Sequence, residues 1–116
     1  MEFDTFTVSL LVLRDDAPVW DEATAAAMQD AHLDFLATLH EQGHLLAAGP
    51  LDHDGFRGLS ILRGTPDEVR ALKEADPAVQ AGRFRVVVAA WQVPAGAVHF
   101  TPTRFPHSIA DVVGDA

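Results

Sequence analysis

Two residues of the kinds that move protons, His32 and Asp76, interrupt patterns in which other residue types are usual. Histidine is the side chain whose ordinary charge change falls near neutral pH, so it serves as a general acid or base. A carboxylate that accepts a hydrogen bond from one imidazole nitrogen fixes the tautomer and leaves the other nitrogen for proton transfer. If the fold brings His32 and Asp76 into contact, we expect the pair to carry out acid–base chemistry on a small molecule.

Both residues also have ordinary structural interpretations. His32 lies four residues after Met28 on an apolar helix face, so it points toward the core. A backbone carbonyl can satisfy such an imidazole, whereas an unpaired one costs about 1–3 kcal/mol. Asp76 stands at a helix break before Pro77, where it can cap the short turn that follows. On these interpretations neither residue has a chemical role.

The elements that must position these residues follow from periodicity and turn signals. Apolar residues spaced three and four apart indicate helices, and short runs rich in Val, Leu and Ile indicate strands. Thr65 begins a helix with a capping-box pattern, and Val69, Leu72 and Ala75 supply its inward face. The predicted elements are a strand over 5–13, a helix from an N-cap at Asp21 to a stop at Gly43, strands over 45–49 and 58–63, a helix from Thr65 to Ala75, a turn over 78–81 and a strand over 84–93.

This β-α-β-β-α-β order predicts a ferredoxin-like α+β fold, in which an antiparallel sheet carries both helices on one face. The other face also needs a cover, because residues 10–13 and 86–91 are apolar at consecutive positions instead of alternating. A second copy of the chain provides one, sheet against sheet. We therefore expect a homodimer.

The chain divides into a body over 1–93 and a C-terminal extension over 94–116. The extension contains three prolines, which discourage a long helix or a central strand. Its apolar residues are too frequent for a free disordered tail. We expect an extended strap that packs on the body or on the partner subunit, with room for a short terminal helix.

Composition excludes several classes of function. The 116 residues carry a formal net charge of −9, and the few basic residues are scattered, which argues against nucleic acid and anionic membranes as partners. No stretch is long and apolar enough to span a membrane and no basic signal peptide opens the chain, so we expect a cytoplasmic protein. The sequence contains no cysteine, which rules out thiolate catalysis and disulfides. A small molecule remains as the expected partner.

Several motifs together resemble the YCII-related (YciI-like) family over approximately residues 5–92. They are His32-Leu33, Gly43, Ala48-Gly49-Pro50, Arg57-Gly58, the run from Ala75 to Phe84 with its Asp76-Pro77 pair and Gly82, and Trp91. The resemblance implies a dimeric α+β barrel of ferredoxin-like protomers. It also implies a pocket, proposed to be catalytic, in which a histidine and an aspartate at the positions of His32 and Asp76 come together. One member type is a dehydrochlorinase that acts on a chlorinated hydroxyquinol.

The resemblance and the two residues together predict a small-molecule enzyme in which His32 and Asp76 transfer a proton. The reaction class is a lyase step, dehydrochlorinase-like elimination or isomerisation, and it needs no cofactor. The alternative is a non-catalytic module of the same fold that binds a small molecule without converting it. A third interpretation makes His32 purely structural.

Five further residues are expected to bind the substrate: Gly49, Pro50, Ser60, Arg83 and Trp91. The Gly49 amide at a pocket rim, and equally Arg83, can hold an anionic oxygen. Ser60 is also a candidate nucleophile, although no nucleophile-elbow motif surrounds it. Each has a structural alternative as well: a strand end for Gly49-Pro50, packing for Ser60 and Trp91, and solvation for Arg83.

A metal site built on histidines is a weaker possibility. His40 and His44 are four residues apart, with His32 and His53 as further candidate ligands. Gly43 ends the helix between the first two, so they need not share a face, and no carboxylate spacing completes a recognised site. We therefore predict no metal site.

Overall fold

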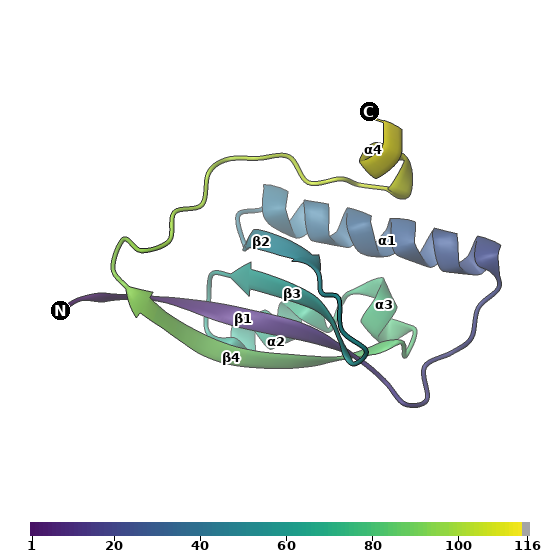
Figure 1. Ribbon diagram of the computed structural model, residues 1–116, viewed down its shortest axis with the longest axis horizontal. Helices are drawn as coiled ribbons and strands as arrows, with labels where there is room; N and C mark the ends of the chain where they lie inside the picture. Colours follow the sequence, from purple (N-terminus) through teal and green to yellow (C-terminus); the bar gives the residue numbers. More distant parts are fainter. Residues whose placement is uncertain (115–116) are drawn as a thin grey trace.

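The computed structural model describes residues 1–114, and its elements follow the predicted order (Figure 1). Asp115 and Ala116, the last residues of the predicted extension, lie outside the described part of the chain. The elements are β1 (Phe3–Leu13), α1 (Glu22–Glu41), β2 (Leu45–Pro50), β3 (Phe56–Leu62), α2 (Pro66–Lys73), α3 (Pro77–Gln80), β4 (Phe84–Pro94) and α4 (Ile109–Gly114).

The four strands form one antiparallel sheet in the order β2-β3-β1-β4. β1 is central and pairs with β4 along its whole length, from Phe3 opposite Pro94 to Leu13 opposite Phe84. This topology confirms the predicted ferredoxin-like α+β fold, with its helices on one face of the sheet. In Figure 1, α2 lies behind the sheet and α1 runs along the β2 side.

The core lies between the helices and this face of the sheet. Its buried centre consists of Leu39 from α1, Leu45 from β2, Leu62 from β3 and Val69 from α2. Burying a side chain of this size stabilises the fold by roughly 1.5–3 kcal/mol. The cluster therefore holds both α1 and α2 against the sheet.

The end of α2 differs from the prediction. Thr65 caps the helix as expected and accepts a hydrogen bond from the Glu68 amide. The helix ends at Lys73, so Ala75 lies beyond it and is exposed instead of facing the core. Lys73 takes the inward position and is fully buried.

Residues 95–114 run back across the molecule from the end of β4 to α1, where α4 lies beside the helix (Figure 1). Phe100 packs edge-on against Phe6 of β1, and Phe105 stacks on His40 of α1 with ring centroids 4.0 Å apart. We call residues 95–114 the tail. None of the helices within residues 1–114 is both long enough and apolar enough to cross a membrane.

Candidate functional site

His32 and Asp76 form a hydrogen-bonded pair. His32 Nδ1 lies 2.7 Å from Asp76 Oδ2; the aspartate side chain is fully buried and the histidine side chain is 14% exposed. An ionised carboxylate only accepts hydrogen bonds, so we assign the imidazole proton to Nδ1, which donates it to Asp76. This tautomer leaves the lone pair of Nε2 for a substrate.

The chain holds Asp76 in place with local structure. Asp76 is the N-cap of α3, and its Oδ1 accepts a hydrogen bond of 2.9 Å from the Ala78 amide. Pro77, the first residue of α3, has a fixed φ that suits this position. Both carboxylate oxygens are therefore hydrogen-bonded, one to the Ala78 amide and the other to His32. Asp76 thus acts both as an N-cap and as the partner of the imidazole.

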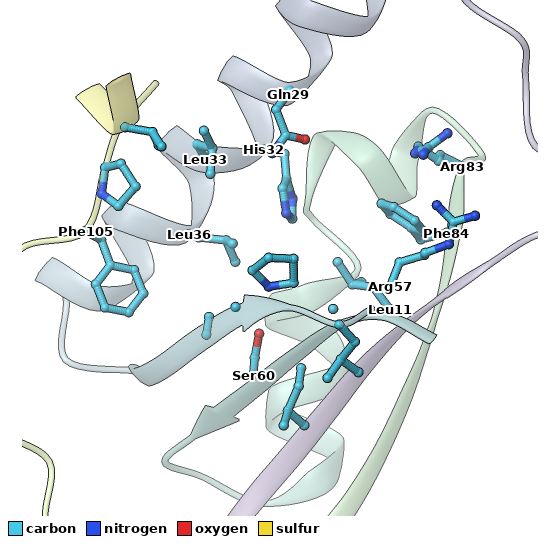
Figure 2. Close-up of a pocket in the computed structure, with 18 of the residues that line it drawn as sticks. Leu11, Gln29, His32, Leu33, Leu36, Arg57, Ser60, Arg83, Phe84 and Phe105 are labelled. Carbon is cyan, nitrogen blue, oxygen red and sulfur yellow. The ribbon is translucent and has the colours of Figure 1, made fainter. Parts of the chain in front are cut away.

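His32 projects from the middle of α1 into a cavity of about 590 Å³ between that helix and the strands β2 and β3 (Figure 2). Nε2 has no hydrogen-bonding partner among residues 1–114. The volume lies within the range of small-molecule sites, which are mostly apolar with a few fixed polar groups. The polar and aromatic side chains of the lining are Gln29, His32, Arg57, Ser60, Arg83, Phe84 and Phe105.

Four of the five residues expected to bind substrate line this cavity: Gly49, Pro50, Ser60 and Arg83. A smaller cavity of about 190 Å³ adjoins it, and His32 and Arg83 belong to the walls of both. Arg83 is held there by cation–π contact, with its guanidinium carbon 5.0 Å from the centroid of the Phe84 ring.

Trp91, the fifth expected residue, is not among the described residues that line this cavity. The β1–β4 register places Trp91 opposite Phe6, and the two rings lie 6.3 Å apart on the sheet face that the helices leave open. Side chains alternate between the faces of a strand, so a shift of one residue decides the side. Trp91 is 36% exposed there.

The sequence interpretation missed Lys73, the only lysine in the chain. Its side chain is fully buried, and Nζ lies 3.3 Å from Ser60 Oγ. Burial lowers the pKa of Lys73 to about 8, because desolvation penalises the ammonium, while the charge of Asp76 acts in the opposite direction. The available signal was its spacing: Lys73 follows the buried Val69 by four residues and therefore shares its helix face.

A family model for the YCII-related domain matches residues 8–92. The chain belongs to the YCII-related family. The match includes His32, Asp76, Lys73 and Ser60 and ends before the tail. No protein of curated function matches the chain.

A similar solved structure is 5-chloro-2-hydroxyhydroquinone dehydrochlorinase (TftG) from Burkholderia phenoliruptrix AC1100, in complex with 2,5-dihydroxybenzoquinone. The two chains are 23% identical, with a TM-score of 0.55, and the likeness covers 74% of this chain and 92% of that one. At this identity the comparison establishes the shared fold of the YCII-related domain.

Two other histidines of the YCII-related domain bind backbone groups. His40 Nδ1 lies 2.7 Å from the Leu45 carbonyl oxygen, and its Nε2 lies 3.1 Å from that of Thr103 in the tail. His53 Nδ1 accepts the amides of Gly55 and Phe56. Within residues 1–114, no group of three His, Asp or Glu side chains is arranged to hold a metal ion.

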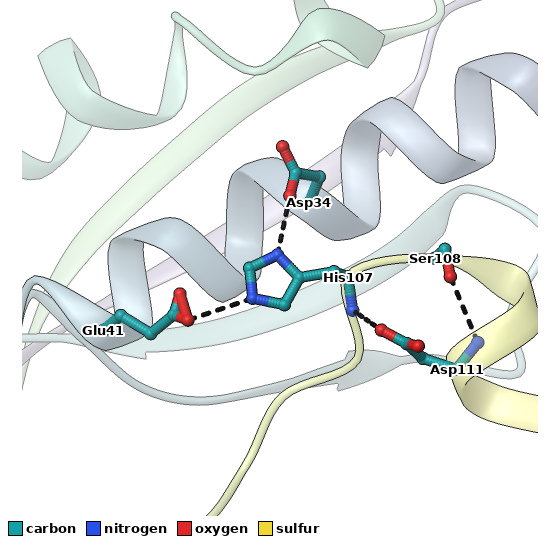
Figure 3. A network of polar contacts seen from close by, with 5 residues as sticks. All are labelled: Asp34, Glu41, His107, Ser108 and Asp111. Atoms are coloured by element: carbon teal, nitrogen blue, oxygen red, sulfur yellow. Dashed lines mark hydrogen bonds and ion pairs between the residues drawn. The ribbon is translucent and has the colours of Figure 1, made fainter. Parts of the chain in front are cut away.

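The tail, outside the YCII-related domain, forms one wall of the cavity through Phe105, Pro106, Ile109 and Val112. His107 fastens it to α1 (Figure 3): Nδ1 lies 2.6 Å from Asp34 Oδ1 and Nε2 lies 3.0 Å from Glu41 Oε1. The Ile109 amide also donates to Asp30 of α1. We call the contacts of His107 with Asp34 and Glu41 the tail clamp.

The tail clamp should weaken as pH rises. Hydrogen bonds with Asp34 and then Glu41 raise the pKa of His107 above its ordinary value. A group whose pKa is raised by folding stabilises the folded form below its unfolded pKa, and this contribution is lost as pH rises through the folded pKa. Amide-exchange protection factors over residues 105–114 should therefore be higher in mildly acidic than in mildly alkaline buffer. His107→Gln should abolish the difference, and equal wild-type protection at both pH values would contradict this role.

Proposed function

We propose that this YCII-related chain is a small-molecule enzyme that uses His32 and Asp76 as an acid–base pair. The observation that carries the proposal is the 2.7 Å contact between His32 Nδ1 and the buried Asp76, beside a cavity into which the unpartnered Nε2 opens. A histidine with only a structural role has no need of an ionised partner and an open cavity together. The reaction class is elimination, including dehydrochlorination, or isomerisation.

The geometry of the pair supports the following proton transfer. His32 Nε2 accepts a proton from a carbon or oxygen of the substrate, and the electron pair of the broken bond forms a new double bond in the substrate. In a dehydrochlorination, chloride leaves with its own electron pair; in an isomerisation, the imidazolium returns the proton to another atom. Asp76 stabilises the imidazolium through Nδ1, since a charge-assisted hydrogen bond is stronger than a neutral one. The apolar lining limits the water that competes for the proton.

The proposal is tested by a panel of hydroxylated and chlorinated benzenes and quinones in deuterated buffer. We include 2,5-dihydroxybenzoquinone, the compound bound by TftG. Proton NMR reports deuterium incorporation or elimination, and native mass spectrometry reports binding. We expect wild-type protein to exchange or eliminate at least one compound faster than buffer does. Binding without any conversion would instead favour the non-catalytic module.

We also propose that two copies of the chain pair through the sheet faces opposite the helices. β1 and β4 lie in front of α2 in Figure 1, and the outer side of β3, β1 and β4 carries a group of apolar, partly exposed residues. They include Val8, Leu10, Leu59, Ile61, Val87 and Trp91. An apolar surface that spans several strands is typical of an interface, because leaving it in water is costly.

Sedimentation velocity at micromolar concentration should give a dimer. Val87→Glu, in the centre of this face, should give a monomer because the carboxylate would be buried without a partner. Thr38→Glu, on the exposed surface of α1, is the control and should leave the dimer intact. A wild-type monomer under these conditions would rule out the pairing.

A further inference from the structure

We propose that the smaller cavity, of about 190 Å³ beside His32, binds a small monovalent anion of the halide type and receives the group that leaves when His32 takes up a proton. The binding of the anion is argued from the wall of this cavity alone. Its role as the leaving group rests on the proposed function, in which the rest of the ligand lies in the main cavity.

The smaller cavity adjoins the main one at the imidazole. The residues that belong to the walls of both are Gln29, His32, Arg83 and Phe84. Figure 2 shows Gln29 next to His32 on α1 and Arg83 across from them. A volume of about 190 Å³ is below the usual range of sites for small organic molecules. A water molecule takes up about 30 Å³ in the liquid, so an ion and a few waters fit.

The first observation is the number of free N–H donors in this wall. Besides His32, its polar side chains are the indole of Trp20, the amide of Gln29 and the guanidinium of Arg83. None of these three side chains has a hydrogen-bond acceptor among residues 1–114. Arg57 in the main cavity differs, because its Nε donates to a backbone carbonyl at 2.8 Å. An acceptor that enters the smaller cavity therefore meets three donors without a partner in the described chain.

The second observation is the charge of the wall. The sequence has 17 acidic and 8 basic residues, yet the described residues that line the smaller cavity include Arg83 and no Asp or Glu. Arg83 is partly buried, and its guanidinium carbon lies 5.8 Å from the centroid of the Trp20 ring and 5.0 Å from that of the Phe84 ring. Ring contacts use the faces of a guanidinium, whereas its N–H groups point outward in its plane. The cation is thus held in place with its donors still available.

The third observation is the apolar character of the remaining wall, which selects the kind of anion. Ala25, Met28 and Ala78 offer no hydrogen-bonding side chain, so an ion that enters gives up part of its hydration. The cost of this loss increases with the charge of the ion and decreases with its radius. Sulfate and fluoride are therefore disfavoured. Chloride and bromide suit a wall that combines apolar groups with a few N–H donors.

A chloride in this cavity completes the proposed elimination. When His32 Nε2 takes a proton from carbon, the electron pair of the C–H bond forms the new double bond. The C–Cl bond breaks, and both of its electrons leave on chloride. The products are the unsaturated ligand, the imidazolium and chloride. Arg83 and the imidazolium both belong to the wall around the ion, so positive charge stabilises chloride as it departs.

Anion binding is measured on the full chain by NMR of its two indole N–H groups. Trp20 lies in the wall of the cavity, whereas Trp91 lies on the open sheet face and serves as an internal control. Sodium bromide and sodium chloride, balanced with sodium fluoride to constant ionic strength, should shift the Trp20 signal to saturation and leave that of Trp91 in place. Sodium sulfate should give no saturable shift. Trp20→Phe assigns the two signals.

Arg83→Met should weaken bromide binding roughly tenfold to a hundredfold, the usual effect of losing a hydrogen bond to a charged group. Gln29→Met, at an exposed helix position where folding is not at risk, should weaken it about twofold to tenfold. Arg63→Met is the matched control, because Arg63 is an exposed cation outside both cavities, and it should bind bromide as wild type does.

Three results would overturn the anion site. The first is a Trp20 shift that never saturates with bromide or chloride. The second is a saturable shift of equal size with sulfate or fluoride. The third is unchanged bromide affinity in Gln29→Met and in folded Arg83→Met protein.

The leaving-group role is tested with a chlorinated compound that wild-type protein converts. Bromide at concentrations that saturate the Trp20 shift should slow the release of chloride, because the ion occupies the space that chloride must enter. Arg83→Met should release chloride more slowly and lose its sensitivity to bromide. Chloride release that is unaffected by saturating bromide would overturn this role.

The outcomes separate this inference from the proposed function. Conversion of a panel compound by wild type, without a saturable bromide shift, would refute the anion site alone. A saturable shift that depends on Arg83, with no conversion of any compound, would refute the acid–base function and the leaving-group role and leave the anion site in place.

Discussion

Replacing His32 with glutamine should lower turnover of the substrate identified by the exchange panel by about 10²- to 10⁴-fold, the usual contribution of a general acid or base. Glutamine keeps a polar side chain of similar reach and can still contact Asp76, but it cannot take up a proton at neutral pH. Nε2 is the atom that opens into the cavity, so the loss should fall on kcat more than on KM.

His99→Gln is the matched control for this experiment. His99 is exposed, lies outside the cavity and should tolerate the change with full turnover. Circular dichroism should show that His32→Gln retains its fold, and native mass spectrometry should show that it still binds the panel compound. Undiminished turnover in a folded His32→Gln protein is the result that removes the acid–base proposal.

Replacing Asp76 with alanine should reduce the free energy of unfolding by about 3–5 kcal/mol, the range observed when one partner of a buried ion pair is removed. Two donors lose their acceptor at once, the Nδ1 group of His32 and the Ala78 amide. The ammonium of Lys73 also loses the favourable influence of a nearby negative charge. Urea denaturation at neutral pH, followed by fluorescence, measures the change.

Two variants separate the causes. Asp21→Ala removes an exposed N-cap that accepts the Thr24 amide at 2.7 Å, so it should cost only about 1 kcal/mol. Asp76→Asn keeps an oxygen for the Ala78 amide but loses the charge and turns an amide NH2 group, a donor, toward His32 Nδ1, so its cost should lie between the two. A loss in Asp76→Ala no larger than that in Asp21→Ala would mean that Asp76 acts as a cap alone.

The order of elements could be predicted from the sequence because its local signals agree with the final packing. Thr65 and Pro66 mark the start of α2, and the spacing around His32 identifies the helix face that turns inward. An aspartate N-cap is common, so Asp76 could be chosen only because the resemblance to the YCII-related family pairs its position with that of His32. Its contact with His32 joins two residues that are 44 positions apart in the sequence, and helix or strand periodicity does not predict the distance between their side chains.

The remaining parts of the site depend on register and on polar burial, which local patterns describe poorly. The sequence could not show which sheet face carries Trp91, because the consecutive apolar residues of β4 hide the alternation of its two faces. Lys73 was overlooked because lysines are almost always exposed unless they are paired. Phe105 is separated from the domain by a segment whose path no local signal determines.

The hydrogen-bonded pair of His32 and Asp76, proposed to transfer the proton, lies within the YCII-related domain, whereas one wall of its cavity comes from residues 105–112, beyond that domain. Under the proposed function, the groups that react and part of the wall that selects the substrate would thus occupy separate stretches of the polypeptide. Mutations in the distal stretch can change which compounds are admitted without disturbing the imidazole or its carboxylate. Descendants of this scaffold can therefore acquire new specificities by remodelling their carboxyl-terminal strap while conserving one reaction.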